Sequence, residues 1–531
     1  MLSLDQLPIS FTLLLMVAIY IRSTTNLFNL LSNIMWIGNK NRVYKERGFR
    51  TTSEKYIICI PMLREQRVVS ETLRYFSQLN YPKDKYHIVV VTTTKEITEK
   101  NKRLKQLNKL AKDISQGKSL SAIRGEYLGL LPHNQLEIIC KDNHHENYLV
   151  VLKKVKNIYK QLPTTFDLAT KEAEIINARL KSKLITVMNY PYSQGVMSHQ
   201  INYVVRKFAK NKQNTNSIFA VYNADSRPNP NTLRHVTFAL KEFEEETDIK
   251  PNIVQQSSLF TLNYNKYPTT FTGYSLKAAA LFQTKWTLVR ELTRFRSQSH
   301  SVLIYKDNFI SKLFNTKISH CVGHGLFVRF GVLKNECFPT ETINEDLPFG
   351  FYQCCKGEPI LPLPILENSE TPDTLKSLMN QKRFWFTPYI QYLNCRDKVL
   401  RLKKYRSRLE VEILTAQAEL TGLIWLLQSF VLFMPLIIGL YLHSLSIIIM
   451  WIIGMLLYWF VPIGLIYANL SRLENIAGKS ISKINLIDYI LTSFSGLYIL
   501  FTHSIGPILC VRDFALAKFI NKPITKLKTE R

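Results

Sequence analysis

Three acidic side chains of this 531-residue sequence stand just beyond β-branched runs. Glu65, Glu96 and Asp225 follow the runs that end near residues 60, 92 and 222. Carboxylate oxygens bind hard cations such as Mg2+ and Mn2+, although a single aspartate on a loop often only forms a turn. The ligand of an open α/β sheet lies beyond the carboxyl ends of its strands. We therefore expect the three segments to converge on one pocket.

The surrounding segments predict the elements that position these residues. We expect strands at 55–60, 87–92, 184–188 and 217–222, and a helix at 68–78. Short β-branched runs that alternate with helical runs are typical of an α/β domain with a Rossmann-like, mostly parallel sheet. Residues 97–183 are charged and helical in pattern, so we expect a helical insertion there.

Long apolar runs flank this region. Residues 8–37 are broken only by Arg22 and a few small polar side chains, and residues 420–468 are almost continuously apolar. A spanning helix needs about 20 apolar residues, so the second run predicts two spans, at about 420–442 and 445–468. The first run lacks the basic region and the cleavage site of a signal peptide, so we interpret it as a retained anchor.

The segment at about 486–511 is also long enough to cross a membrane. It contains Gly506-Pro507 and precedes a basic tail, which a full crossing would carry outside against the positive-inside rule. We expect a re-entrant or interfacial segment instead. The predicted parts are a membrane anchor with a basic juxtamembrane segment at 1–50, an α/β domain at 51–400, and a membrane region at 401–531.

The net charge of +29 first suggests a nucleic-acid partner. Many of the basic residues, however, flank the apolar runs, at 40–47 and 401–408. That distribution is the positive-inside pattern, and it predicts contact with membrane lipids and a cytoplasmic α/β domain. The eight cysteines form no C-x-x-C pair, which indicates reduced thiols and agrees with a cytoplasmic location. We therefore expect an integral protein of an inner (cytoplasmic) membrane and no nucleic-acid partner.

Short motifs follow one another along the chain in an order that is informative. They are Pro61-Met62-Leu63-Arg64-Glu65, the segment from Gly195 to Asn202, Asn223-Ala224-Asp225, the segment from Cys321 to Phe327, Asn344-Glu345-Asp346, the segment from Asn380 to Trp385, and the tail from Pro523 to Thr529. This order resembles the family-2 glycosyltransferases, in particular membrane-bound bacterial-type members. The resemblance implies a GT-A-like fold and transfer of a sugar from a nucleotide-diphosphate donor, most commonly a UDP-sugar.

The resemblance also implies a donor site. Its residues would be Pro61, Glu65, Glu96, Gly195, Asn202, Asn223, Asp225 and Arg383. Asn223-Ala224-Asp225 stands where the family has a metal-binding Asp-x-Asp, so Asp225 is expected to hold Mg2+ or Mn2+ against the diphosphate. The chain departs from the family at Arg64, Val196 and Asn223, where the family has asparagine, lysine and aspartate.

On the acceptor side, Glu345 and Asp346 occupy the last two positions of the family's Thr-Glu-Asp triplet, whose final residue is the general base. The same two residues could instead cap a helix that begins near Leu347. The implied acceptor-binding residues are Gly323, His324, Gly325, Phe384 and Trp385. An arginine and aromatic cluster before a membrane helix is otherwise an ordinary interfacial anchor.

The leading interpretation is therefore an inverting hexosyltransferase-type enzyme that acts on a hydroxyl of a lipid-linked or cell-envelope glycan. A processive polysaccharide synthase is the alternative within the same class. A catalytically inactive membrane scaffold is the alternative outside it, because three motif positions depart from the family. The sequence leaves the oligomeric state open.

Overall fold

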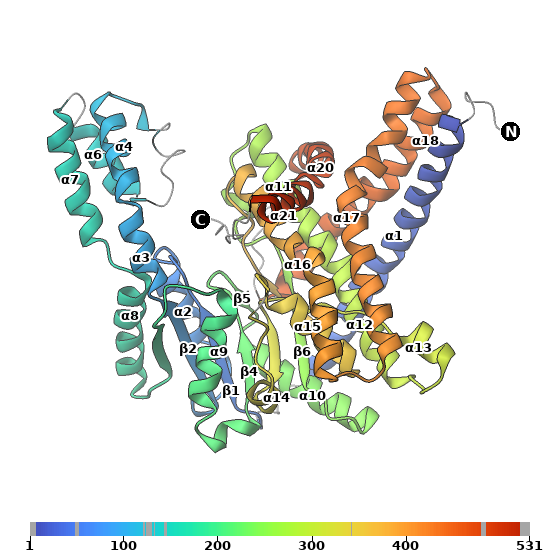
Figure 1. Ribbon diagram of the computed structural model, residues 1–531, viewed down its shortest axis with the longest axis horizontal. Helices are drawn as coiled ribbons and strands as arrows, with labels where there is room; N and C mark the ends of the chain where they lie inside the picture. Colours follow the sequence, from blue (N-terminus) through green and yellow to red (C-terminus); the bar gives the residue numbers. More distant parts are fainter. Residues whose placement is uncertain are drawn as a thin grey trace.

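The computed structural model describes residues 7–47, 53–120, 123, 130–131, 133–142, 146–340, 342–478 and 485–520. It contains a mixed α/β body with an eight-stranded sheet and four helical segments long and apolar enough to cross a membrane (Figure 1). The tail motif at 523–529 lies outside the described residues.

The first half of the sheet is parallel. Its strands are β1 (Tyr56–Pro61), β2 (Tyr86–Thr93), β3 (Ile185–Tyr190) and β4 (Ile218–Val221), in the order β3-β2-β1-β4. Each strand lies within two residues of its predicted bounds. All six residues of β1 are buried because the strand has a hydrophobic core on both faces. Its parallel neighbours bring their carboxyl ends to one edge of the sheet.

The second half of the sheet is mixed. Its strands are β5 (Arg227–Pro228), β6 (Ile253–Leu259), β7 (Leu326–Arg329) and β8 (Ile360–Asn368), and the order continues from β4 as β7-β6-β8-β5. Strand β7 runs antiparallel to both β4 and β6, and β5 runs antiparallel to β8. The expectation of a mostly parallel sheet is thus right for the first half and wrong for the second. An apolar run buried on both faces carries no signal of strand direction.

Helices cover both faces of the sheet. One face packs against α2 (Val69–Ser77), α8 (Thr165–Leu180) and α10 (Thr232–Thr247), and the other against α9 (Met197–Phe208), α14 (Phe330–Asn335) and α15 (Asp346–Lys356). Successive side chains of β1 point to opposite faces of the sheet. Ile58 and Ile60 belong to the hydrophobic core on the first face, and Ile57 and Cys59 belong to the core on the second.

A helical segment separates β2 from β3. It comprises α3 (Lys95–Lys102), α4 (Leu104–Ser115), α6 (His133–Asp142), α7 (Tyr148–Gln161) and α8, and no strand occurs in its described part. Helices α4, α6 and α7 project from one end of the sheet and form a separate small core with Leu107, Leu110, Val151 and Val155 (Figure 1).

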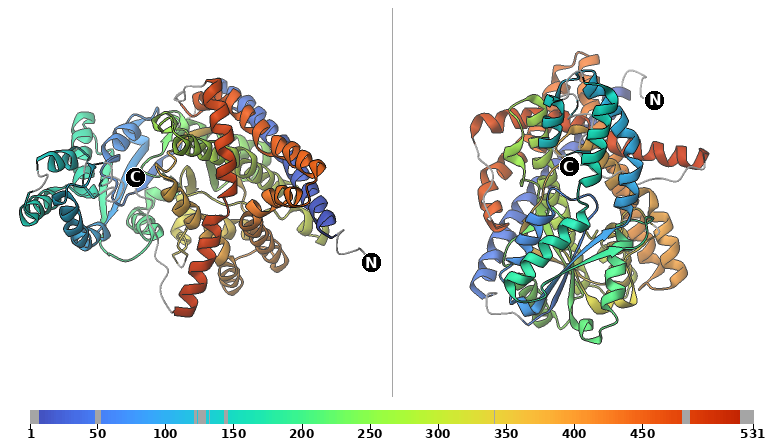
Figure 2. Two further views of the ribbon diagram at one scale, coloured as in Figure 1. Left: turned by 90° about the horizontal axis from the view of Figure 1, so that it is seen from above. Right: turned by 90° about the vertical axis from the view of Figure 1, so that its left-hand side faces the viewer.

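The four candidate spans are α1 (Leu7–Arg47), α17 (Arg408–Tyr441), the segment from α18 (Leu445–Met455) through a π-helical turn to α19 (Val461–Ile476), and the segment that joins α20 (Leu486–Phe501) to α21 (Ile505–Ile520). Helices α17 and α18 meet at His443, whose φ of 47° makes the sharp turn at the predicted break. The first three segments form a bundle, whereas α20 and α21 lie across the direction of α1 and α17 (Figures 1 and 2).

Four further helices link the α/β body to these segments. They are α11 (Phe271–Trp286), which continues through a π-helical turn into α12 (Leu292–Leu303), then α13 (Phe309–Asn315) and α16 (Leu375–Leu402). Helix α11 packs along α20, and α16 packs along α17 and α21. These contacts link the candidate spans to the α/β body.

Candidate functional site

A cavity of about 290 Å3 lies where several loops of the sheet meet α16. Eight of the residues singled out in the sequence line it: Asn223 and Asp225 after β4, Gly323 and His324 before β7, Glu345 and Asp346 at the start of α15, and Phe384 and Trp385 in α16. The cavity therefore joins residues from four segments that are far apart in the chain.

The loop that carries Asp225 is held by the residue that starts β5. Arg227 donates from Nη1 to the carbonyl oxygens of Ala224, at 3.2 Å, and Ser226, at 2.9 Å. Arg227 also pairs with Asn368 at the end of β8, so the loop is anchored to a distant strand. Asp225 is only 4% exposed, and the contacts of Arg227 hold its loop against the sheet.

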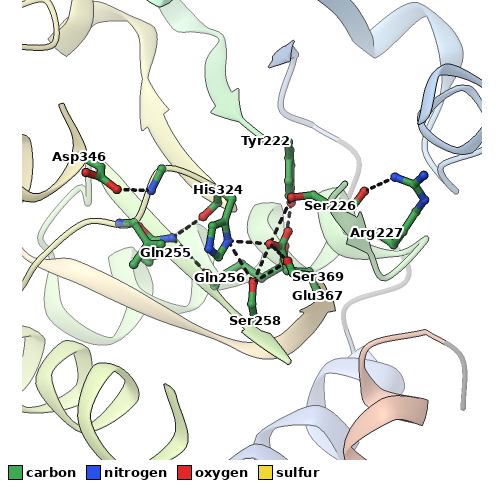
Figure 3. Close-up of polar contacts among 12 residues, drawn as sticks. Tyr222, Ser226, Arg227, Gln255, Gln256, Ser258, His324, Asp346, Glu367 and Ser369 are labelled. Carbon is green, nitrogen blue, oxygen red and sulfur yellow. Dashed lines mark hydrogen bonds and ion pairs between the residues drawn. The ribbon is translucent and has the colours of Figure 1, made fainter. Parts of the chain in front are cut away.

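His324 forms an ion pair with a buried carboxylate. Its Nδ1 lies 2.6 Å from Oε1 of Glu367 and 3.0 Å from the Ser258 hydroxyl, which itself donates to Glu367 at 2.7 Å (Figure 3). Burial, the largest single influence, lowers the pKa of His324, but the charge and hydrogen bond of Glu367 together with the charges of Glu291 and Asp225 raise that pKa to about 8. An imidazolium therefore stands beside Asp225 at neutral pH.

Asp346 is held by two backbone groups. Its Oδ2 accepts a hydrogen bond from the Gly323 amide at 2.7 Å (Figure 3). Its Oδ1 accepts one from the Leu347 amide at 2.8 Å. Burial raises the pKa of Asp346 above its ordinary value, and the two hydrogen bonds and the charge of His324 only partly oppose that shift. A carboxylate with a raised pKa is a stronger base, and this one has a fixed orientation.

The loop before β7 is shaped to approach this carboxylate. Gln255 of β6 accepts from the Val322 amide at 2.9 Å and donates to the His324 carbonyl at 2.8 Å. A Cβ on Gly323 would lie only 3.2 Å from Oδ2 of Asp346, so glycine permits the close contact. Gly325 has a φ of +60° and packs against Gln256, which gives it a backbone role outside the cavity lining.

The start of α15 also tests the alternative that Glu345 and Asp346 only cap this helix. Glu345 precedes the helix, and its side chain makes no capping hydrogen bond. Asp346 is the first helical residue, where the helix dipole stabilises a negative charge. Its hydrogen bond with the Gly323 amide joins α15 to the loop before β7, and helix capping does not require this bond.

Helix α16 brings its aromatic residues to the cavity but not its arginine. The Asn344 side chain donates to the Phe384 carbonyl at 3.3 Å, which ties the helix to the turn before α15. Trp385 faces Phe260 with ring centroids 6.4 Å apart. Arg383 forms an ion pair with Asp513 of α21 and does not line the cavity.

The other predicted donor residues lie at the same edge of the sheet, outside the cavity lining. Pro61 ends β1 opposite Val91. The Glu65 amide donates to Thr165 at 2.9 Å, and Glu96 accepts hydrogen bonds from three donors in the neighbouring segments.

Gly195 and Asn202 belong to the loop before α9 and to that helix. Gly195 has a φ of +116°, a conformation that glycine adopts without strain. Asn202 is 3% exposed, and its amide both donates to and accepts from the backbone of Phe338. The side chain of Asn202 is therefore committed to holding α9 in place.

Several residues of the cavity were not singled out from the sequence. Glu291, Arg294, Lys382, Trp425 and His503 line it. Glu367 supports His324, and it stands at the end of β8, where the same end-of-strand rule could have found it. His503 and Trp425 come from segments read only as membrane helices, and no local pattern connects them to the site.

A divalent cation fits this site only together with a substrate. Within the described residues, no group of three histidine, cysteine, aspartate or glutamate side chains is arranged to hold a metal ion. Mg2+ is commonly bound by one or two carboxylates plus substrate phosphates and waters. Asp225, with the neutral oxygen of Asn223, supplies that minimal set, whereas a charged His324 has no free lone pair to offer.

No protein-family model and no curated protein matches this sequence. Among solved structures, the mannosyltransferase PcManGT from Pyrobaculum calidifontis, in complex with GDP-Man and Mn2+, is similar at 12% identity over 94% of this chain and 99% of that chain, with a TM-score of 0.38. Residues 1–349 of S. aureus TarS, in complex with UDP-GlcNAc, are similar at 11% identity over 85% of this chain and 92% of that chain, with a TM-score of 0.32. At these values the likeness defines neither the activity nor the substrate of this chain.

Proposed function

We propose that this chain is a membrane-bound, inverting glycosyltransferase of the family-2 type with a GT-A fold. It would transfer a sugar from a nucleotide-diphosphate donor, a UDP-sugar in the first instance, to a hydroxyl of a lipid-linked or cell-envelope glycan. The observation that carries the proposal is the position of Asp225 and Asp346 in one cavity at the carboxyl edge of the sheet. One buried carboxylate would hold the cation that neutralises the leaving group, and the other would take the proton of the acceptor.

Asp225 and Asn223 would hold Mg2+ or Mn2+ on the donor side, and the cation would neutralise the charge of the leaving diphosphate. The imidazolium of His324 adds a second positive charge in the same cavity. Preorganised charges of this kind stabilise a transition state because they need no reorganisation during the reaction. Pro61, Glu65 and Gly195 mark the loops over which the nucleoside would lie.

Asp346 would act as the general base. The amides of Gly323 and Leu347 hold its carboxylate, and its raised pKa favours uptake of the proton from the acceptor hydroxyl. One base and one direct displacement at the anomeric carbon invert its configuration. Phe384 and Trp385 offer aromatic faces to the acceptor sugar on the same side of the cavity.

We infer that the α/β body is cytoplasmic and that the chain resides in an inner membrane. Basic residues cluster at the end of α1, at Lys45 and Arg47, and again just before α17, at Arg401 and Lys403. That placement supports contact with the anionic inner leaflet.

The first prediction tests the donor site. Asp225→Ala should leave a folded protein that no longer shows Mn2+-dependent binding of a UDP-sugar by calorimetry, since the cation loses its carboxylate. Asp84→Ala is the matched control, because Asp84 is exposed and precedes β2 at the opposite edge of the sheet. Unchanged Mn2+-dependent binding in Asp225→Ala would disprove the assignment, and absence of donor binding by the wild type would favour the inactive scaffold.

A further inference from the structure

The cavity extends from the carboxylates toward the membrane-facing helices. At this inner end it is lined by Phe282 of α11, Lys382 of α16, Trp425 of α17 and His503 from the junction of α20 and α21. Trp425 and His503 belong to two of the segments that are apolar and long enough to cross a membrane. The inner end thus opens between the α/β body and the membrane region.

These four side chains contact one another in a row. The ammonium of Lys382 lies 5.9 Å from the ring centroid of Phe282, and that ring meets His503 edge-on at 4.6 Å. His503 also stacks on Trp425 at 5.5 Å between ring centroids, with an interplanar angle of 23°. Lys382 and His503 therefore point into the same small volume, and we call these two residues the inner cation site.

The polar atoms of the inner cation site lack partners. Lys382 is 3% exposed and His503 4% exposed. Within the described residues, neither Nζ of Lys382 nor either ring nitrogen of His503 has a hydrogen-bond partner. Burial lowers the pKa of Lys382 to about 7. A buried amino group without a partner destabilises the fold, so its retention indicates that something else satisfies it.

Two other basic side chains of α11 and α16 differ from Lys382 in having carboxylate partners. Lys277 and Arg383 are paired with Asp488 and Asp513, whereas no ion pair within 4 Å joins Lys382 to a described carboxylate.

The same cavity is lined by further charged side chains. Arg294 lies in its lining, and so do the carboxylates of Asp225, Glu291, Glu345, Asp346 and Glu370. None of these carboxylates forms a hydrogen bond with Lys382, so an anionic group of a ligand would supply the missing partner.

Resting on the proposed function, we propose that the inner cation site binds a phosphate group of an amphiphilic acceptor, with Lys382 and His503 as hydrogen-bond donors. Phosphate offers both negative charge and several acceptor oxygens, and lysine binds it as a point charge. A neutral glycan would leave the ammonium uncompensated. The apolar rings of Phe282 and Trp425 then contact the part of the acceptor that leads toward the membrane.

The test uses the full chain in a neutral maltoside detergent and measures binding by calorimetry. The probe is dodecyl phosphate, compared with 1-dodecanol, inorganic phosphate and UDP. Lys382→Met removes the charge with little change of volume, His503→Asn removes the ring, and Lys376→Met is the matched control on an exposed position of the same helix. We expect Lys382→Met to weaken dodecyl phosphate binding by about 10- to 100-fold, while the control binds like the wild type.

A stability measurement separates loss of the ligand site from misfolding. Lys382→Met removes an unpaired buried cation, so its unliganded Tm should equal or exceed that of the wild type. If this variant fails to fold, His503→Asn supplies the same comparison. Inorganic phosphate that binds as tightly as dodecyl phosphate would identify a free anion and not an amphiphile as the ligand.

Three results would overturn the inference. The first is wild-type affinity of Lys382→Met for dodecyl phosphate, and the second is binding of 1-dodecanol as tight as that of dodecyl phosphate. The third is a loss of UDP affinity in Lys382→Met equal to its loss of dodecyl phosphate affinity, which would make the site part of the donor pocket. The glycosyltransferase proposal is judged separately by Mn2+-dependent donor binding. Dodecyl phosphate binding that depends on Lys382 in a protein without donor binding would retain the anion site and reject the enzyme.

Discussion

At the level of single residues, charge pairs buried in the cavity set the protonation of the site. His324 has a pKa of about 8 because Glu367, with smaller contributions from Glu291 and Asp225, overcomes the effect of burial. The ordinary pKa of a histidine is about 6.5, so folding favours the protonated form. This contribution to stability is complete below about pH 6.5 and is lost as the pH rises through about 8.

The second prediction follows from that pair. The shift corresponds to about 2 kcal/mol of stability, so Glu367→Gln should lower the free energy of unfolding by about that amount at pH 6 and by much less at pH 9. Denaturant unfolding at both values measures it, with Glu244→Gln on the exposed side of α10 as the control. A loss of the same size at both pH values would show that the His324 charge is not the cause.

The third prediction concerns the base. Asp346→Asn keeps an oxygen that can accept from the Gly323 amide but cannot take a proton. Turnover should therefore fall by about 100-fold or more, with little change in donor affinity. A steady-state assay together with calorimetry separates the two effects, and turnover within a few-fold of the wild type would leave only the role at the start of α15.

At the level of elements, Glu96 joins three segments around the end of β2. It accepts from the Arg64 amide at 3.2 Å, from the Gln66 side chain at 2.6 Å and from the Thr165 amide at the start of α8 at 2.9 Å. Arg64 itself has a φ of 57°, a left-handed conformation that asparagine adopts more readily. The carboxylate thus holds the loop after β1 against the helical segment.

The fourth prediction is that Glu96 mainly stabilises the contact between the loop after β1 and the helical segment, and does not bind the nucleobase of the donor. Glu96→Gln places an amide donor against backbone donors, so the free energy of unfolding should fall by about 1 to 3 kcal/mol. The ratio of affinities for UDP and GDP should stay the same. Glu174→Gln on the exposed face of α8 is the control. A changed nucleotide preference at unchanged stability would assign Glu96 to the base.

At the level of the whole molecule, the last two helices are oriented differently from the other candidate spans. Helix α20 contacts α11 through Lys277 and Asp488, and α21 contacts α16 through Arg383 and Asp513. The chain breaks between them at residues 502–504, just before Gly506. Since both helices lie against the α/β body and across the direction of α17, we expect them at the membrane surface (Figure 2).

The fifth prediction places the C-terminus on the same side as the α/β body. A C-terminal tag should be protected from an impermeant label in intact cells. A tag inserted at the turn between α17 and α18, near His443, should be labelled, because the hairpin places that turn on the far side. Labelling of the C-terminal tag would mean that the α20 and α21 segment crosses the membrane.

Local sequence signals predicted the elements that build the catalytic end of the site. The β-branched runs and the residues after them led to β1, β2 and β4 and to Asp225, and the apolar runs led to helices long and apolar enough to cross a membrane. These signals are reliable because periodicity and composition are properties of a contiguous segment. The loops before β7 and at the start of α15 were found only through motif resemblance, because neither has a distinctive local pattern.

The sequence by itself therefore determined the order of the elements, the apolar segments and the acidic residues at strand ends. Only the tertiary structure decided that β7 runs antiparallel, that Arg383 pairs with Asp513 away from the cavity, and that Lys382 and His503 meet beside Phe282. Strand direction, ion-pair choice and the meeting of distant side chains depend on which surfaces pack together. Packing is settled by the burial of the whole chain, and no single segment encodes it.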